Sequence, residues 1–236
     1  MKLENAVVLI TGANRGLGLA FAREALARGV RTVYAGARDP ATIKLPGVVP
    51  VRLDVTRPEE IAAAARAYPD VTLLINNAGI ASTGGYLTEG SADAARAMME
   101  TNFIGPLLVS KAFAPTLAAN GGGAILNVLS IASWVSGPLL AMYAASKSAA
   151  WSLTNGLRQE LRDQHTQVVG LHAGFIDTDL TRGIEFPKST PESVVKAALD
   201  GLVAGAIEVL ADDISRQVHS GLSATPAVYL QPLDRE

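Results

Sequence analysis

Short apolar runs rich in β-branched residues recur along the chain and alternate with stretches of helical periodicity, and the first run, at residues 6–10, is unbroken. Such runs are typical of strands buried on both faces of a parallel sheet, because a half-exposed strand alternates apolar and polar positions. Strands are predicted at residues 6–10, 31–36, 48–53, 71–75, 124–129, 167–171 and 206–210. Helices are predicted at residues 17–28, from 56–59 onward, 91–117, 142–162, from 190–192 onward, and from 215 into a tail with a loose end. This alternation predicts a parallel sheet covered by helices on both faces.

The composition is that of a compact globular protein. The chain has 236 residues, a length that α/β folds commonly reach as one domain, with 49% hydrophobic and 18% charged residues. No linker, repeat or low-complexity segment divides it, so residues 1–236 are expected to form a single domain. A net charge of −2 gives no attraction toward nucleic acid or an anionic membrane.

Targeting and metal-binding signals are missing from the sequence. There is no cysteine, and His165, His172 and His219 lack metal-ligand spacing, so no metal site is expected. The amino terminus does not resemble a signal peptide, and no apolar run approaches the ~18 residues of a membrane helix. A soluble cytoplasmic protein without membrane or nucleic-acid partners is the expectation.

A glycine-rich loop follows the first strand directly. It reads Thr11-Gly12-Ala13-Asn14-Arg15-Gly16-Leu17-Gly18 and leads into the first helix. Glycines let the backbone approach a ligand, and the free N–H groups of the helix start favour a pyrophosphate. The spacing differs from Gly-x-Gly-x-x-Gly, so a plain glycine turn is the alternative.

Arg38 lies 20 residues after Gly18, at the end of the second strand. In dinucleotide-binding folds an acidic residue near this position binds the ribose 2′-hydroxyl, whereas an arginine accommodates a 2′-phosphate. Arg15 could reach the same phosphate from the other side. The pattern favours NADP(H), with NAD(H) possible. In the alternative, Arg38 is a solvated charge and Asp39 binds the ribose.

Polar residues end the third and fourth strands. Asp54 either accepts a hydrogen bond from an adenine amine or belongs to the start of the next helix, where Thr56 precedes Glu59 by three residues. The segment Asn76-Asn77-Ala78-Gly79 either ties adjacent loops together or forms a simple turn.

Asn102 lies inside the predicted 91–117 helix, where asparagine is unfavourable because its amide competes with the backbone. It either marks a local distortion that holds a water or is simply tolerated.

Tyr143 and Lys147 are four residues apart on one helix, so their side chains share a face. A cation close to a phenol favours the phenolate and moves its pKa from ~10 toward neutrality, which suits a proton donor and acceptor. Ser130, at the end of the fifth strand, is separated from Tyr143 by a loop long enough to bring its hydroxyl to the same point. A Tyr-x-x-x-Lys pair alone is weak, since a core tyrosine beside a solvated lysine gives the same pattern.

Together these motifs occur in the order and spacing of one family. They are Thr11-Gly12-x-x-x-Gly16-x-Gly18, Asn76-Asn77-Ala78-Gly79, Asn102, Ser130 and Tyr143-x-x-x-Lys147. Over nearly its whole length the chain resembles the short-chain dehydrogenase/reductase family. The resemblance implies a single doubly wound α/β Rossmann domain with a mostly parallel seven-stranded sheet. Asn14-Arg15 and Ala37-Arg38-Asp39 are similar to the NADP-preferring members.

The resemblance also implies roles for individual residues. Tyr143 is expected to be the general acid in ketone reduction and the general base in alcohol oxidation, and Lys147 to lower its pKa and bind the nicotinamide ribose. Ser130 is expected to hold the substrate oxygen, and Asn102 to support a water relay. The cofactor-binding residues implied besides Tyr143 and Lys147 are Gly12, Asn14, Arg15, Gly16, Leu17, Gly18, Arg38, Asp54, Val55, Asn77, Ala78, Gly79, Gly174, Ile176 and Thr178.

One segment departs from the family pattern. The family has Pro-Gly after the sixth strand, and this chain has Ala173-Gly174, which leaves the backbone there less restrained. The loop at residues 180–190, which covers the substrate in the family, is short, so a pocket open to bulky or varied carbonyl compounds is expected.

The resulting expectation is an NADPH-dependent carbonyl reductase or alcohol dehydrogenase that acts on a small-molecule carbonyl or alcohol. Two rivals stay open, namely an NADP(H)-binding redox sensor with little turnover and a related isomerase or dehydratase. The resemblance also implies a homodimer or homotetramer. The 91–117 and 142–162 helices would then be the surface to inspect.

Overall fold

A seven-stranded sheet forms the centre of the computed structural model, which describes residues 1–231. The strand order is β3-β2-β1-β4-β5-β6-β7, and every neighbouring pair is parallel. The strands are β1 (Val7–Ile10), β2 (Thr32–Ala37), β3 (Val49–Arg52), β4 (Leu73–Asn76), β5 (Ala124–Val128), β6 (Gln167–His172) and β7 (Glu208–Leu210). The predicted α/β fold is confirmed, with each strand within two residues of its expected bounds.

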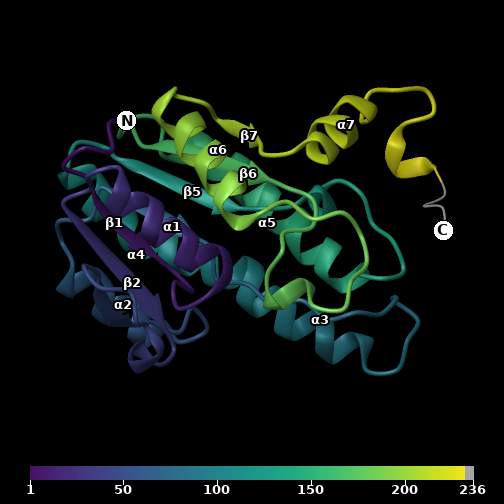
Figure 1. Cartoon of the computed structure of the whole chain (residues 1–236), viewed down its shortest axis with the longest axis horizontal. Coiled ribbons are helices and arrows are strands. Elements are labelled where there is room, and N and C mark those ends of the chain that lie inside the picture. The colour runs from purple at the N-terminus through teal and green to yellow at the C-terminus, as the bar shows by residue number, and fades with distance from the viewer. Residues whose placement is uncertain (232–236) are drawn as a thin grey trace.

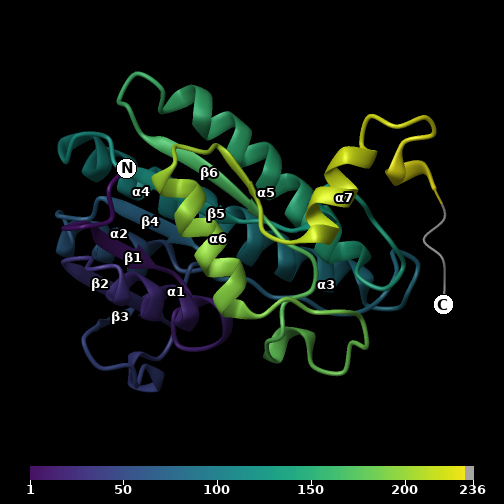
Figure 2. The ribbon, with the colours of Figure 1, turned by 45° about the horizontal axis from the view of Figure 1, so that its top comes forward.

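Helices cover both faces of this sheet (Figures 1 and 2). The α-helices are α1 (Gly16–Ala27), α2 (Pro58–Ala67), α3 (Ser91–Met99), α4 (Gly105–Ala119), α5 (Ala141–Glu160), α6 (Pro191–Val203) and α7 (Asp213–Gly221). Short 3-10 turns are η1 (Pro40–Thr42), η3 (Ile131–Ser133), η4 (Asp179–Thr181) and η5 (Val228–Leu230). The predicted loose end of the tail falls on residues 232–236, outside the described residues.

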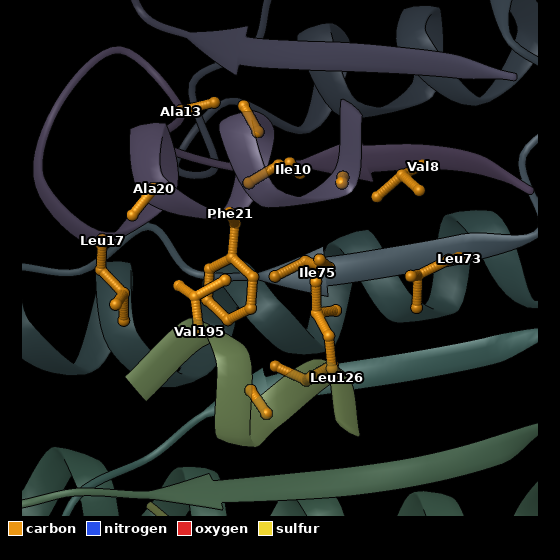
Figure 3. Packing of buried hydrophobic residues seen from close by; sticks show 14 of the residues in the cluster. Val8, Ile10, Ala13, Leu17, Ala20, Phe21, Leu73, Ile75, Leu126 and Val195 are labelled. Atoms are coloured by element: carbon orange, nitrogen blue, oxygen red, sulfur yellow. The ribbon is translucent and has the colours of Figure 1, made fainter. Parts of the chain in front are cut away.

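Two hydrophobic layers hold the helices to the sheet. On one face Phe21 of α1 is fully buried and packs in one cluster with Ile75, Leu126 and Val195 of α6 (Figure 3). On the other face α2, α4 and α5 bury a second cluster that includes Phe113. Strands buried on both faces explain why the sequence shows short apolar runs.

The long helix predicted at residues 91–117 is interrupted. A π-helical turn (η2, Glu100–Ile104) joins α3 to α4 and contains Asn102, so of the two interpretations of this asparagine the local distortion is the one observed. Single π turns inside helices are rare, and those that do occur often lie at functional sites.

Helix α2 begins where the sequence predicts, but the predicted capping by Thr56 is wrong. Arg57 is the N-cap and makes no side-chain capping bond, whereas Pro58 occupies the first turn as expected. Thr56 donates its hydroxyl to Asp54 instead, and Glu60 accepts from the Asp54 backbone N–H.

The sheet order reverses between β1 and β4. The chain leaves β1 toward β2 and later returns to pair β4 with the other edge of β1. In open α/β sheets the crevice at such a switch point binds the ligand. Figure 1 shows α3, α7 and the loop before α6 gathered at the end of the sheet away from the N-terminus. Within residues 1–231 no helix is both long and apolar enough to cross a membrane.

Candidate active site

A cavity of about 1430 Å³ opens along the carboxyl ends of the strands. Its walls are the loops that follow β1 to β7, so residues far apart in sequence face one space. Every cofactor-binding residue predicted from the sequence lines it. Ser130, Tyr143 and Lys147 line it as well. Asn102 is buried and does not line it.

The glycine loop is shaped by close approach of its own backbone. Gly12 has φ +67°, a left-handed conformation that favours glycine, and a Cβ on Gly18 would lie 2.1 Å from the Gly12 carbonyl oxygen. Asn77 donates its side-chain amide to the Thr11 and Gly12 carbonyls at 2.9 and 3.1 Å. The Thr11 hydroxyl accepts from the backbone N–H groups of Asn77 and Ala78. The interpretation that the segment after β4 ties adjacent loops together is therefore confirmed.

These contacts leave a bare backbone cradle at the start of α1, which fits a pyrophosphate. Arg15, the N-cap of α1, contributes no side-chain capping bond, so its side chain does not block the first turn. The observed geometry thus fits the dinucleotide that the sequence predicts.

Four polar residues in the loops that follow β1, β2 and β3 have contacts that bear on their predicted roles. Arg38 is exposed and lines the cavity. Arg15 instead lies 3.3 Å from Asp179, in a solvent-exposed ion pair that is worth little on its own. Asp54 accepts from the backbone and hydroxyl of Thr56 and also lines the cavity, so the two interpretations of Asp54 are compatible. Asp39 caps η1 through the Ala41 N–H, which occupies one of its oxygens.

The side chain of Asn102 is committed to protein partners. Its amide donates to the Ile80 carbonyl and the Ser146 hydroxyl, and its oxygen accepts from the Ile80 N–H, each at 2.9 Å. It therefore joins the segment after β4 to α5. A water relay through Asn102 would have to use the backbone of the π turn, and that role stays a prediction.

Ser130, Tyr143 and Lys147 meet where β5 gives way to α5. Ser130 caps η3 through the Ala132 N–H, and its hydroxyl is close enough to the Tyr143 phenol to lower that group's pKa by hydrogen bonding. The Lys147 Nζ donates to the Val128 carbonyl at 2.7 Å and lies 5.6 Å from the centre of the Tyr143 ring. The spacing of four residues on α5 places phenol and ammonium side by side, as predicted.

The expected direction of the tyrosine shift is wrong for this structure. Burial raises the pKa of Tyr143 to about 12, with the Ser130 hydroxyl opposing the shift. Burial also lowers the pKa of Lys147 to about 8. Desolvation of the phenol is the larger of the two causes acting on the Tyr143 pKa, and the Lys147 charge is not one of them. Without a cofactor, the phenol is neutral across the physiological range, so it can act as a proton donor.

His172 lies behind Ser130. The imidazole is fully buried at the end of β6, stacks on Trp134 at 3.9 Å between ring centroids, and places Nδ1 3.1 Å from the Ser130 carbonyl oxygen. A carbonyl only accepts, so Nδ1 carries the proton. The other nitrogen, Nε2, lies 3.8 Å from a Glu208 carboxylate oxygen and is buried without a hydrogen-bond partner among the described residues. The sequence offered no signal for this contact.

Asp212 restrains the loop that lacks the family's proline. Its carboxylate accepts from the Gly174 N–H at 2.9 Å and from the Ser189 hydroxyl at 3.1 Å, and it caps α7 through Ser215. A Cβ on Gly174 would lie 2.4 Å from the Ile214 side chain. The backbone after β6 is therefore held by α7, although proline is absent. Asp212 is not among the residues predicted from the sequence, although its Asp-x-x-Ser capping box is a local signal for the start of α7.

Among residues 1–231, no three acidic or histidine side chains are arranged to hold a metal ion.

Comparison with known proteins agrees with this geometry. A family model described as short chain dehydrogenase matches residues 6–188. Dehydrogenase/reductase SDR family member 7B of Bos taurus is 35% identical over 197 residues, which cover 76% of this chain and 60% of that protein. This chain thus spans less than two thirds of the length of that relative.

Solved structures share the architecture. A short chain dehydrogenase from Burkholderia cenocepacia J2315, in complex with NADP, is 41% identical, has a TM-score of 0.93 and covers 98% of this chain and 100% of its own. A short chain dehydrogenase/reductase from Burkholderia phymatum, in complex with NAD, is 24% identical with a TM-score of 0.86 and covers 100% of both chains, which shows the fold alone. The chain belongs to the short-chain dehydrogenase/reductase family of oxidoreductases.

Proposed function

We propose that the protein reduces a ketone or aldehyde to an alcohol with NADPH, reversibly, on a single Rossmann domain. The observation that carries this proposal is the meeting of a neutral Tyr143 phenol, the Ser130 hydroxyl and the Lys147 ammonium in the cavity that the glycine loop and Arg38 also line. Ser130 and Tyr143 can act on one carbonyl oxygen, which gains negative charge as the carbonyl is reduced, and Lys147 acts through Tyr143.

In this mechanism each residue has a separate task. Ser130 donates a hydrogen bond to the carbonyl oxygen and keeps it beside the phenol. Tyr143 then donates its proton to that oxygen, and the Lys147 ammonium stabilises the phenolate that remains. When bound, NADPH supplies the hydride that reaches the carbonyl carbon. The ketone gains one hydride and one proton, and the product is the alcohol.

The cofactor preference rests on charge at the adenosine end of the cavity. Arg38 presents an exposed guanidinium there, and the Burkholderia cenocepacia relative, 41% identical, contains NADP. A guanidinium can bind a phosphate through two parallel hydrogen bonds. NADH cannot accept them because it lacks the 2′-phosphate.

Arg38→Ala is expected to raise the KM for NADPH about 10- to 100-fold, corresponding to the ~1.5–3 kcal/mol of a hydrogen bond to a charged group, and to leave the KM for NADH nearly unchanged. Initial rates with both cofactors measure this. Arg15→Ala is the matched control, and a smaller effect is expected because Arg15 already pairs with Asp179. An equal rise in the KM for both cofactors would mean that Arg38 does not bind the 2′-phosphate.

The reaction is tested by a panel of aldehydes, ketones and quinones with NADPH and NADH in parallel. Stoichiometric loss of NADPH with formation of alcohol supports a reductase. Product formation without net loss of NADPH would indicate an isomerase or dehydratase, and binding without turnover across the panel would indicate a redox sensor. Comparable rates with both cofactors would contradict the preference for NADPH. Cytoplasmic location and a homodimer or homotetramer stay predictions.

His172 is expected to position Ser130 without touching substrate. His172→Leu removes the only side-chain donor to the Ser130 carbonyl among the described contacts, so kcat is expected to fall about 10-fold with little change in KM, equivalent to the ~1–2 kcal/mol of one buried hydrogen bond. His172→Asn, whose amide can reach the Nδ1 position, is expected to restore most of the rate. A loss that asparagine does not rescue, or one confined to KM, would assign His172 to packing alone.

A further inference from the structure

We propose that the body of the substrate, apart from its carbonyl group, is apolar and uncharged, and that affinity grows with its length. This inference rests on the proposed function and deepens it. It concerns the part of the cavity beyond Tyr143, which we call the outer compartment and which is lined by the loops before α5 and α6 and by α7.

Large apolar side chains stand exposed around the outer compartment. The exposed fractions are 36% for Ile80, 42% for Leu139, 48% for Leu180, 50% for Phe186 and 43% for Ile214, and all five line the cavity. They come from segments that follow four different strands, so the fold gathers them at one place. Scattered apolar residues on a surface need no explanation, but a concave group of them marks a binding site for an apolar ligand.

The aromatic residues give this compartment a flat wall. The rings of Phe175 and Phe186 are stacked, with centroids 5.2 Å apart and planes at 11°. Half of Phe186 stays exposed even though one face of its ring is covered. A ligand that lies against the free face would remove that surface from water.

The charged side chains around the outer compartment are occupied by protein partners. Arg216 donates to the Leu210 carbonyl at 2.9 Å and to Asp213 at 2.6 Å, and Lys188 donates to the Thr181 carbonyl at 2.9 Å. Asp179 pairs with Arg15 and Arg182, and the Asp212 carboxylate accepts from three groups. An ionic substrate would have to compete for these groups, whereas an apolar one gains from the exposed side chains without disturbing them.

The test is a homologous series of straight-chain methyl ketones from four to eleven carbons, with NADPH saturating, beside keto acids of the same lengths. The kcat/KM is expected to rise about fourfold per methylene over the first several carbons, mainly through KM, since each buried methylene contributes about that factor. The keto acids are expected to be at least 30-fold poorer than ketones of equal length. A flat series, or keto acids as good as the ketones, overturns the inference.

Failure of the inference and failure of the proposed function give different results. If short and long ketones are reduced equally well, the protein is a carbonyl reductase and only the apolar compartment is wrong. If no carbonyl compound is reduced although NADPH binds, the proposed function is wrong.

Phe186→Ala is expected to lower kcat/KM for the longest ketone about 10-fold and by progressively less for shorter ketones, while the Kd of NADPH stays unchanged. Leu87→Ala is the matched control, because Leu87 is fully exposed but does not line the cavity, and no effect on the series is expected. An equal loss for all chain lengths would contradict a contact between Phe186 and the ketone tail.

Discussion

Tyr143→Phe is expected to lower kcat/KM for ketone reduction by about 10²–10⁴-fold, the range in which a single general acid contributes. The change removes one oxygen atom and with it the only phenolic proton among the described residues that line the cavity. Burial raises the pKa of this phenol to about 12, so it holds its proton at neutral pH, and the loss should be similar from pH 6 to pH 8. Rates at saturating NADPH across this range measure both effects.

The fold and cofactor binding serve as controls for this variant. The described hydrogen bonds of Tyr143 within α5 come from its backbone, so the ring without its hydroxyl should pack as before. The midpoint of urea unfolding and the Kd of NADPH are expected to stay close to those of the wild type. A variant that keeps more than a tenth of the wild-type rate would exclude Tyr143 as the proton donor, and the redox-sensor alternative would gain support.

Much of the fold could be predicted because its strands are buried on both faces. Unbroken apolar runs such as 6–10 are distinctive, and the intervening helices have clear apolar faces. The cofactor-binding residues could also be predicted. Local backbone geometry requires glycine at positions 12 and 18 and an amide at Asn77, so these residue types appear as a motif in the sequence.

Long-range contacts between side chains could not be predicted. His172 lies 42 residues from Ser130, and Asp212 lies 38 residues from Gly174, so nothing in local sequence connects them. The interruption at Asn102 was signalled by an unfavourable residue type, but its contact with Ser146 was not.

The predicted direction of the Tyr143 pKa shift was wrong for a related reason. Sequence spacing shows that Lys147 is near the phenol, but it does not show how deeply both groups are buried. Burial makes desolvation the larger cause of the shift, and only the packed structure gives its extent.

Lys147→Met is expected to abolish useful activity while leaving the protein as stable as the wild type or more so. The ammonium is buried and has lost most of its hydration, which is why its pKa falls from 10.5 to about 8. At 1.36 kcal/mol per unit, keeping that charge costs the folded state about 3 kcal/mol at pH 7. Methionine removes the charge but leaves the Val128 carbonyl without its donor, which costs about 1–3 kcal/mol. The net gain in the free energy of unfolding should therefore be about 0–2 kcal/mol at pH 7, with kcat lowered about 100-fold or more.

The pH dependence of this difference separates the buried charge from ordinary packing. Between pH 8 and 10.5 the unfolded lysine binds a proton that the folded one has released, so wild-type stability gains from this group as the pH rises. Methionine has no such gain, and the advantage of the variant should shrink between urea unfolding at pH 7 and at pH 9.5. Lys44→Met, at an exposed loop position, is the control and should show no change with pH. A Lys147→Met protein several kcal/mol less stable than the wild type at pH 7 would show that the lysine stabilises the fold, whereas the expected result identifies it as a charge kept for catalysis at the expense of stability.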